Sequence, residues 1–318
     1  MARIPAPVAT VRTAVRRALS GFPRDALVMV ACSGGPDSTA LAAATSFVAP
    51  RLGLRAGLVT IDHCLQEGSG SRAAAVAAWA EPDFVPVEVV AVDVAGRPGG
   101  PEAAARAARY EALSAVAGRC DAAAVLLGHT RDDQAETVLL ALARGAGPRG
   151  MSGMPVRRGL VLRPFLDVSR ADTRKACAAL GLPTWDDPHN GDPSFARARV
   201  RHDALPALVA ALGPAVIDNL ARTAGQLAAD NAALDDLAAA ALSDEPLVED
   251  LSEMPDAIRT RVLHMWALRI GAPGSALSHR HVAALDALVT DWHGQGPTAL
   301  PGGILVARKD GRLCRTAL

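Results

Sequence analysis

Short apolar runs alternate with segments of helical spacing through the first half of the 318-residue chain. Apolar runs of strand length predict buried strands at residues 26–32, 55–61, 85–94 and 122–127. Helical segments are predicted after them, at residues 39–48, 71–80, 102–117 and 132–144, and a first helix is predicted from the spacing of Val8, Val11, Val15 and Leu19. Strands buried on both faces and separated by helices indicate a parallel sheet in an α/β domain, where ligands bind at the carboxyl ends of the strands.

The pattern changes after Gly145. Ser169 and Asp172 are spaced like a capping box for a helix that runs to Leu180. From Pro214 onward the spacing predicts helices at residues 216–242, 255–270 and 278–289, followed by short strands between 300 and 315. We therefore expect two domains: a Rossmann-like α/β domain with a parallel sheet at residues 1–213, and a smaller, mainly helical C-terminal domain at residues 214–318.

Charge is balanced over the whole chain and uneven within it. The 33 basic and 33 acidic residues give a formal net charge of zero, which neither favours nor excludes a nucleic-acid partner, because binding needs only a local basic patch. From Arg144 to Asp203 there are eleven Arg or Lys and six Asp, a local net charge of +5. This stretch is either a solvated surface segment or a phosphate-binding face, and charge alone does not separate the two.

The five cysteines, at positions 32, 64, 120, 177 and 314, form no C-x-x-C pair. This argues against a disulfide framework and a zinc ribbon, and it fits a reducing cytoplasm. No apolar run is long enough to cross a membrane. We therefore expect a cytoplasmic protein without a membrane partner.

The string Ser33-Gly34-Gly35-Pro36-Asp37-Ser38 follows a predicted strand and precedes a predicted helix. Glycines let a backbone approach a ligand closely, N–H groups at a helix start attract phosphate, and the serine hydroxyls add donors. Asp37 is out of place in a loop that binds only anions, but it makes sense if Mg²⁺ lies between it and the phosphates. The alternative is an ordinary glycine-rich turn capped by serine. The strand–loop–helix context favours a functional loop, and because no Lys follows the glycines it is not a Walker A loop.

This loop resembles the pyrophosphate-binding loop of the PP-loop (N-type ATP pyrophosphatase) family, whose members split ATP between the α and β phosphates and adenylate an oxygen of their substrate. Four further strings resemble one branch, the tRNA(Ile)-lysidine synthases. In chain order they are Ile61-Asp62-His63-Cys64-Leu65, Ala105 to Tyr110, Gly128 to Thr137 with its continuation Arg144 to Gly147, and Trp185 to Arg201. Together the five strings span roughly residues 26 to 206, in the order of the family.

Each string can also be interpreted from its residue types alone. Asp62 and His63 lie where a strand ends, and each is either near a nucleotide or part of a turn or helix cap. Arg106 and Arg109 share one helix face, where they would clamp phosphate or RNA backbone or form a plain surface pair. The family resemblance favours the functional reading, most firmly for Arg109.

Asp133 and Glu136 also share one helix face, close to the helix start. Two carboxylates in a cleft suit the ammonium or α-amino group of lysine, and one could accept a proton from an attacking amine. The alternative is that they stabilise the helix dipole from its N-terminal turn. His129 with these two acids would suggest a metal site, but we favour the lysine pocket.

The resemblance implies a reaction and a set of roles. The enzyme would adenylate O2 of the cytidine at the first anticodon position of a tRNA(Ile) with a CAU anticodon, and then join L-lysine to C2 to form lysidine, so that the tRNA reads AUA instead of AUG. The expected catalytic residues are Asp37, Asp133, Glu136 and Arg109. ATP would be bound by Ser33 to Ser38, Ile61, His63 and Arg201, with Mg²⁺ on Asp37. Lysine would be bound by Asp133 and Glu136. The tRNA would be contacted by Arg106, Arg144 and Arg197 and by residues 214–318, and a homodimer is a possible assembly.

The chain departs from the family at Cys64, where a glycine is usual, and at Gln66, where an arginine is frequent. The sequence leaves two rival functions open. One is tRNA thiolation, which uses a cysteine pair or an iron–sulfur cluster and would need Cys64 and Cys120 to meet in the fold. The other is a catalytically silent RNA-binding module, against which the intact Asp37, Asp133 and Glu136 argue.

Overall fold

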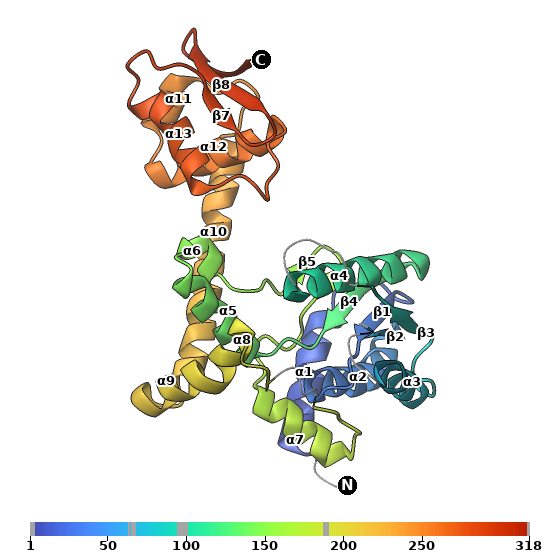
Figure 1. Ribbon diagram of the computed structural model, residues 1–318. Coiled ribbons are helices and arrows are strands. Elements are labelled where there is room, and N and C mark those ends of the chain that lie inside the picture. Colours follow the sequence, from blue (N-terminus) through green and yellow to red (C-terminus); the bar gives the residue numbers. More distant parts are fainter. Residues whose placement is uncertain (1–3, 63, 65–67, 94–100, 187–190, 317–318) are drawn as a thin grey trace. The chain divides into compact units, whose positions relative to one another are not determined.

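The computed structural model describes residues 4–62, 64, 68–93, 101–186 and 191–316 (Figure 1). The chain forms two compact units, Met1–Leu227 and Ala228–Leu318. The division falls inside helix α10 (Val216–Ala240), later in the chain than the expected boundary at residues 213 and 214. His63, one of the expected ATP-binding residues, lies outside the described residues.

The first unit contains a six-stranded sheet in the order β3-β2-β1-β4-β6-β5. Pairing is parallel from β3 to β6, and β5 is antiparallel to β6. The strands are β1 (Leu27–Ala31), β2 (Arg55–Asp62), β3 (Val87–Ala91), β4 (Ala122–Leu127), β5 (Arg157–Arg158) and β6 (Val161–Leu162). The four predicted strands and the parallel α/β class are confirmed. The two-residue strands β5 and β6 were not predicted, because they are too short to show a periodic pattern.

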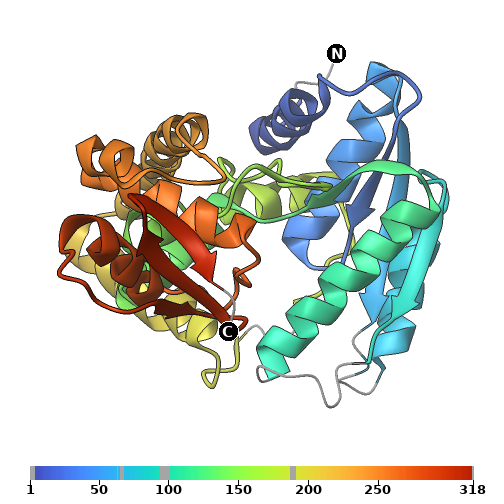
Figure 2. The same cartoon turned by 90° about the horizontal axis from the view of Figure 1, so that it is seen from above.

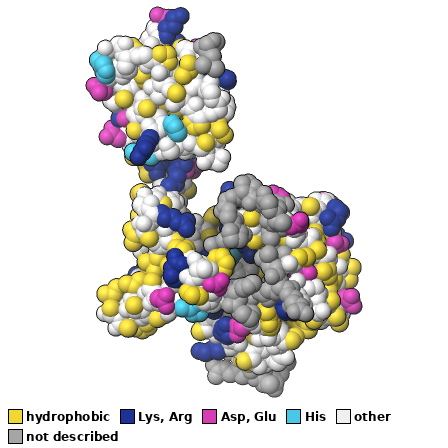
Figure 3. Space-filling model, viewed as in Figure 1, with side chains coloured by type: hydrophobic (Ala, Val, Ile, Leu, Met, Phe, Trp, Pro, Cys, Tyr) yellow, Lys and Arg dark blue, Asp and Glu magenta, His cyan; other side chains and the backbone are white. Residues whose placement is uncertain are grey.

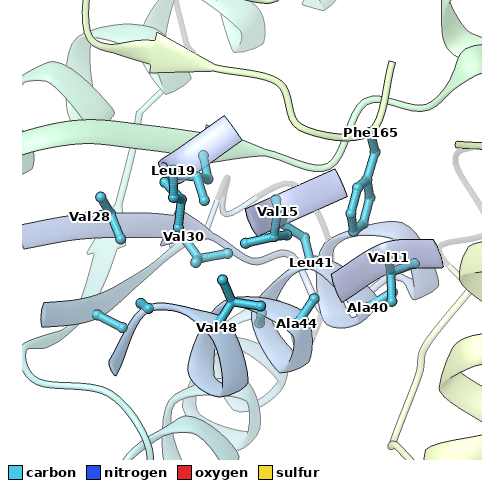
Figure 4. Packing of buried hydrophobic residues seen from close by; sticks show 14 of the residues in the cluster. Val11, Val15, Leu19, Val28, Val30, Ala40, Leu41, Ala44, Val48 and Phe165 are labelled. Atoms are coloured by element: carbon cyan, nitrogen blue, oxygen red, sulfur yellow. The ribbon is translucent and has the colours of Figure 1, made fainter. Parts of the chain in front are cut away.

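Helices cover both faces of this sheet (Figures 1 and 2). The helices of the first unit that precede α10 are α1 (Ala6–Leu19), α2 (Pro36–Val48), α3 (Ser69–Ala80), α4 (Pro101–Arg119), α5 (Arg131–Ala143), α6 (Gly147–Met151), α7 (Arg170–Leu180), α8 (Ala196–Arg199) and α9 (Leu205–Leu212), with a 3₁₀ turn at Pro50–Leu52 and a π turn at Val200–Ala204. On one face, Val11, Val15 and Leu19 of α1 point toward β1 and α2 (Figure 4). On the other face, Leu113 and Val116 of α4 pack against β1, β2 and β4.

The core is built from Val, Leu and Ala, as the low aromatic content requires. In the main cluster, Val28 and Val30 of β1 and Leu41 and Val48 of α2 are fully buried. Phe165 is the largest buried side chain on this face of the sheet. Burial of aliphatic surface on both faces fixes β1 in the middle of the sheet, so that the loop after it is held at a defined place.

The second unit has its own core and combines helices with a small sheet. It contains the end of α10, α11 (Val248–Glu253), α12 (Asp256–Arg269) and α13 (His279–Thr290), followed by the antiparallel sheet of β7 (Thr298–Leu300), β8 (Ile304–Lys309) and β9 (Arg312–Thr316). Trp266 is buried at its centre, and its indole N–H donates to the carbonyl of Asp244 at 3.0 Å. The long helices and the terminal strands agree with the sequence pattern, whereas the short α11 was not predicted.

Helix α9 leaves apolar side chains on the surface, and hydrophobic side chains gather over it in Figure 3. Leu205 is buried, while Leu212 is 68 % exposed. No single helix in the described parts of the chain has the length and hydropathy of a membrane span, although the bent pair formed by residues 196–212 and 216–240 meets the length and composition criteria together.

Candidate active site

The six-residue loop lies at the point where the strand order of the sheet reverses. Strand β1 has β2 on one side and β4 on the other, and the loops after β1 and β4 leave the same edge of the sheet. In open α/β sheets such a reversal opens a crevice at the carboxyl ends of the strands, where ligands bind. The predicted loop therefore lies at the position in the fold that is best suited to a ligand.

The loop is shaped by glycine and by its own serines. Gly34 has a φ of +83°, a left-handed conformation that other residues rarely adopt. The Ser38 hydroxyl donates to the carbonyl of Gly35 at 2.9 Å and accepts from the N–H of Ser33 at 3.2 Å. Helix α2 begins at Pro36, so its N-terminus points the positive end of its dipole at the loop.

A second loop, after β4, passes close behind the first. A Cβ atom at Gly128 would lie 3.0 Å from backbone atoms of Asp37 and Ser38. A side chain at this position would need the neighbouring backbone to shift by a few tenths of an ångström, so glycine suits this close backbone approach. It brings the start of α5, with its carboxylates, against the start of α2.

These loops border a cavity of about 800 Å³, within the size range of small-molecule sites. Its lining comes from the ends of β1, β2 and β4 and from the helices that follow them. The expected site residues that line it are Ser33, Gly35, Pro36, Asp37, Ser38, Ile61, Arg109 and Arg201. Trp185, Arg170 and Arg174 also line it.

Asp37 stands in the first turn of α2 with its side chain 25 % exposed. The Thr173 hydroxyl donates a short hydrogen bond to its Oδ1, and Arg170 Nε lies 3.7 Å from its Oδ2. Burial raises the pKa of Asp37 to about 6, and the hydrogen bond from Thr173 only partly offsets this effect. A buried carboxylate with so few donors is suited to a cation as its missing partner.

Asp133 and Glu136 meet three arginines in what we call the acid–arginine cluster: Asp133, Glu136, Arg170, Arg197 and Arg201. Arg170 Nη2 donates to Asp133 Oδ1 at 2.8 Å and to Glu136 Oε1 at 3.0 Å. Arg201 donates from Nε to Glu136 Oε1 at 2.7 Å and from Nη2 to Asp133 Oδ1 at 3.0 Å. Arg197 Nε donates to Glu136 Oε2 at 2.9 Å. Both carboxylates are thus occupied by guanidinium groups.

The cluster is buried and strongly polar. The side chain of Glu136 is 0 % exposed and that of Asp133 is 9 % exposed. Burial favours the neutral form of Asp133, but Arg170 and Arg197 outweigh it and hold the pKa of this carboxyl at about 2. Asp133 also closes the capping box of α5, because its Oδ2 accepts from the N–H of Thr130 at 2.7 Å. It therefore serves the helix start and the cluster together.

Arg109 and His129 line the cavity beside this cluster. Among the described residues, Arg109 Nε and His129 Nδ1 are buried without a hydrogen-bond partner. Burial lowers the pKa of His129 to about 3, so its imidazole is neutral near pH 7. Burial also lowers the pKa of Arg109. Two unsatisfied polar groups at a cavity wall are available to a ligand.

The remaining expected residues are spread around the site. Arg106 is exposed and donates to the Tyr110 hydroxyl at 3.3 Å, and Arg144 is exposed at the end of α5. Arg197 instead directs its guanidinium into the acid–arginine cluster. Cys64 has a φ of +53°, which gives a physical reason for the glycine that the family pattern has at this place.

Arg170 and Thr173 were not singled out from the sequence, and Trp185 was named there only as the start of a string that resembles the family. Arg170 and Thr173 lie on α7 and reach Asp37 and the acidic residues, while the N–H of Arg170 donates to Asp132 Oδ2 at 2.8 Å. Arg72 Cζ lies 4.4 Å from the centre of the Trp185 ring. The backbone N–H of Trp185 donates to the carbonyl of Gly34 at 2.9 Å. The only advance signal for Arg170 was the local charge of +5, which did not single out one residue.

The cysteines do not form the pair that thiolation would need at Cys64 and Cys120. Cys64 follows the carboxyl end of β2, whereas Cys120 precedes the amino end of β4, and these strands run parallel to the same neighbour. The two thiols therefore lie at opposite ends of the parallel strands. Cys32 and Cys177 are buried beside the loop, and burial raises the pKa of both thiols, which leaves them protonated and unreactive.

Comparison with known proteins agrees with this geometry. The PP-loop domain family matches residues 9–208, and the TilS substrate binding domain matches residues 247–314. A tRNA(Ile)-lysidine synthase from Salinispora tropica is 64 % identical, covering 98 % of this chain and 97 % of the relative. The enzyme of the same name from Thermobifida fusca is 56 % identical, covering 98 % of each chain.

A solved structure supports the fold alone. The U34-tRNA thiolase NcsA from Methanococcus maripaludis, with its 4Fe-4S cluster, aligns with a TM-score of 0.57 at 15 % identity, covering 70 % of this chain and 79 % of that one. Identity this low carries no function. The family match over more than half of the chain, and relatives above 50 % identity over nearly its whole length, are decisive: the chain belongs to the tRNA(Ile)-lysidine synthase family of PP-loop enzymes.

Proposed function

We propose that the cavity performs the reaction named in the chain's relatives: ATP-dependent formation of lysidine on tRNA(Ile). The observation that carries the proposal is that the PP-loop and the acid–arginine cluster meet at one cavity of about 800 Å³. A phosphate-binding loop and a pair of carboxylates at one site suit a reaction that activates an oxygen with ATP and then replaces it with an amine.

In the first step, O2 of the cytidine forms a bond to the α-phosphorus of ATP, and the bond to the β-phosphate oxygen breaks. Pyrophosphate leaves onto Ser33 to Ser38, where the N-terminus of α2 and the serine hydroxyls stabilise its charge. Arg109, with an unsatisfied Nε at the cavity wall, is placed to bind a phosphate oxygen. Electrostatic stabilisation of phosphate charge is the main contribution of these residues.

Magnesium fits the residues at this loop. Asp37 offers one partly exposed carboxylate beside the phosphate-binding backbone, and Mg²⁺ commonly uses one or two carboxylates together with substrate phosphates. The described residues contain no cluster of three His, Cys, Asp or Glu side chains that could hold a metal without such phosphates. When bound, the ion would neutralise phosphate charge and favour the ionised form of Asp37.

In the second step, the ε-amine of lysine forms a bond to C2 of the adenylated cytidine, and the C2–O bond breaks as AMP leaves with the oxygen. The lysine ammonium must lose a proton before its nitrogen can attack, and Asp133 or Glu136 would accept that proton once a guanidinium group has left it. Asp133 and Glu136 are the residues we assign to lysine. While three arginines hold these carboxylates, and the pKa of Asp133 is about 2, they are poor proton acceptors. Lysine binding therefore requires at least one guanidinium group to move.

We assign the tRNA to the exposed arginines near the cavity and to the second unit. Arg106 and Arg144 are solvent-exposed, as phosphate contacts would require, while Arg197 would reach RNA only after leaving Glu136. Selection of a tRNA with a CAU anticodon, contact of residues 214–318 with RNA, a homodimeric assembly and a cytoplasmic location all stay predictions.

The test is lysine incorporation into RNA. Purified protein, ATP, Mg²⁺ and labelled lysine are incubated with a transcript of tRNA(Ile) that has a CAU anticodon. We expect label in the RNA that depends on ATP, is lost when the first anticodon base is changed, and is abolished by chelation of Mg²⁺. ATP cleavage to AMP without lysine incorporation would retain the PP-loop chemistry and contradict lysine as the nucleophile.

A further inference from the structure

The arginines of the acid–arginine cluster stand between the cavity and the carboxylates. Arg170 and Arg201 line the cavity, whereas Asp133 and Glu136 do not. The side chains of Arg170 and Arg201 are 17 % and 25 % exposed, compared with 0 % for Glu136. A ligand entering the cavity therefore meets guanidinium groups first, and an ammonium group cannot reach Glu136 in this arrangement.

Charge within the acid–arginine cluster together with Asp37 is balanced without a ligand. Asp37, Asp133 and Glu136 carry three negative charges, and Arg170, Arg197 and Arg201 carry three positive charges. The ammonium group of lysine alone would add an uncompensated cation to a buried site, which is unfavourable. The phosphates of ATP would add negative charge at the loop and reverse this imbalance. The two ligands are thus electrostatically complementary through the cluster.

Arg170 is the arginine best placed to respond to phosphate. Its Nε lies 3.7 Å from Asp37 Oδ2 and has no hydrogen-bond partner among the described residues. Its backbone N–H is fixed by Asp132 at 2.8 Å, so its side chain can turn while its backbone stays in place. An unsatisfied buried donor is costly, and a phosphate oxygen at the PP-loop would satisfy it.

The other two arginines each make three hydrogen bonds, compared with two from the side chain of Arg170. Arg201 makes three hydrogen bonds to Glu136 and Asp133. Arg197 binds Glu136, the Asp133 carbonyl and the Thr137 hydroxyl. Neither has an interaction with Asp37 like that of Arg170. Movement of Arg170 alone would free one position on each carboxylate, because its Nη2 contacts both Asp133 Oδ1 and Glu136 Oε1.

We infer that Arg170 couples the two small-molecule sites: without nucleotide it covers the lysine-binding carboxylates, and phosphate at the PP-loop draws it away so that the lysine ammonium can replace it. The inference rests on the proposed function, since it takes lysine as the ligand of Asp133 and Glu136. It makes Arg170 a positioning residue, and it predicts that ATP binds before lysine. By linkage, lysine must tighten nucleotide binding by the same factor.

The test is calorimetric titration of the full chain with L-lysine, with and without α,β-methylene-ATP and Mg²⁺. This analogue occupies the phosphate site but cannot be split between the α and β phosphates, so no reaction disturbs the measurement. We expect lysine to bind the wild type at least about tenfold more tightly with the analogue, within the usual range of such couplings. The reverse titration, analogue into protein with and without lysine, should give the same factor and needs no variant.

Variants separate a coupling role from a structural one. In Arg170→Gln, lysine should bind without nucleotide, and the effect of the analogue should fall below about threefold. Arg170→Lys keeps the charge and should restore most of the coupling. Arg174→Gln is the matched control, because Arg174 is one turn away on α7 and lines the same cavity but pairs with Asp186. It should keep the wild-type ratio of affinities.

Two outcomes would overturn the inference. Equal lysine affinity with and without the analogue in the wild type would contradict the coupling while leaving lysidine formation intact. If a folded Arg170→Gln variant still bound lysine more tightly with the analogue, by the wild-type factor, Arg170 would not be the residue that couples the two sites. If no condition gives lysine binding, and no lysine enters the RNA in the incorporation assay, the proposed function fails as well.

Discussion

The chain buries arginine against carboxylates in both of its units, and the two arrangements differ in completeness. In the second unit, Arg259 is 6 % exposed, and all of its guanidinium nitrogens are used: Nε binds Asp286 at 2.7 Å, Nη2 binds Asp256 at 2.7 Å and Nη1 binds the Met254 carbonyl at 2.9 Å. In the first unit, three arginines share two carboxylates, and the Nε of Arg170 is left without a hydrogen bond.

This difference in hydrogen bonding indicates that Arg259 has a structural role, whereas the acid–arginine cluster has a role in function. Arg259 ties the start of α12 to α13, and it does not line the cavity of about 800 Å³. The acid–arginine cluster lies at a cavity wall, with more guanidinium groups than carboxylates and one unsatisfied donor. Buried ion pairs contribute little net stability, so an incompletely satisfied group of them points to ligand binding.

The largest effect is expected at Asp37, which has no counterpart beside Arg259. Asp37→Asn keeps the shape and the acceptor for Thr173 but removes the charge opposite magnesium and phosphate. We expect lysidine formation to fall by about 10³-fold, because charge aimed at a phosphoryl transition state supplies contributions of this size. Initial rates of lysine incorporation measure it, with circular dichroism as the control for folding. Activity within tenfold of the wild type would remove Asp37 from the catalytic residues.

The second prediction compares the removal of one carboxylate charge from the acid–arginine cluster with the removal of one from the partners of Arg259. Glu136→Gln leaves Arg197 and Arg201 with Asp133 alone and Arg170 with Asp133 and Asp37, and it should cost about 3–5 kcal/mol of stability as well as most of the activity. Asp286→Asn leaves Arg259 with Asp256 and Met254, and Asp286 is 22 % exposed, so the cost should be about 1–2 kcal/mol with activity retained. Denaturant titration and the incorporation assay, run on both variants, compare the two sites. Equal loss of activity in both variants would show that the two buried arrangements do not differ in function.

The third prediction concerns pH. The pKa of Asp37 is raised to about 6 by burial, so between about pH 4 and pH 6 the folded protein holds a proton that the unfolded chain has released. This side chain's contribution to stability therefore falls as pH rises through that window. Asp37→Asn should be more stable than the wild type above pH 6, on the order of 2 kcal/mol, and the gain should disappear near pH 4. A difference in melting that does not vary with pH would show that Asp37 is not strained by burial.

The smallest effect is expected at Cys64. Cys64→Gly removes a side chain held at a φ of +53° but increases the freedom of the unfolded chain, and these effects nearly cancel. We expect a stability change within about 1 kcal/mol and an unchanged rate of lysine incorporation. Loss of activity in this variant would give the thiol a chemical role and revive sulfur transfer as the function.

How much the sequence could predict depended on the range of the interactions. Strand β4 and helix α7 were placed closely, because their signals, an apolar run and the Ser169 cap, are local. The PP-loop was also found, since its glycines and its Asp37 follow one another along the chain. Arg170 was missed because its partners are 34 to 37 positions away, and no local pattern announces such a contact. The same limit explains why Arg197 was assigned to RNA although its guanidinium turns to Glu136.

Gly128 determines how closely the PP-loop and the start of α5 can pack. The backbone of the loop after β4 packs directly against the backbone at the start of α2. A Cβ atom at Gly128 would lie 3.0 Å from backbone atoms of Asp37. The groups that hold the nucleotide and those that hold the amine therefore share one rigid spacing, and reacting groups must be kept within about 0.5 Å of their productive geometry. An added methyl group at Gly128 would need these two loops to move apart by a few tenths of an ångström, which would alter the spacing between the two binding sites.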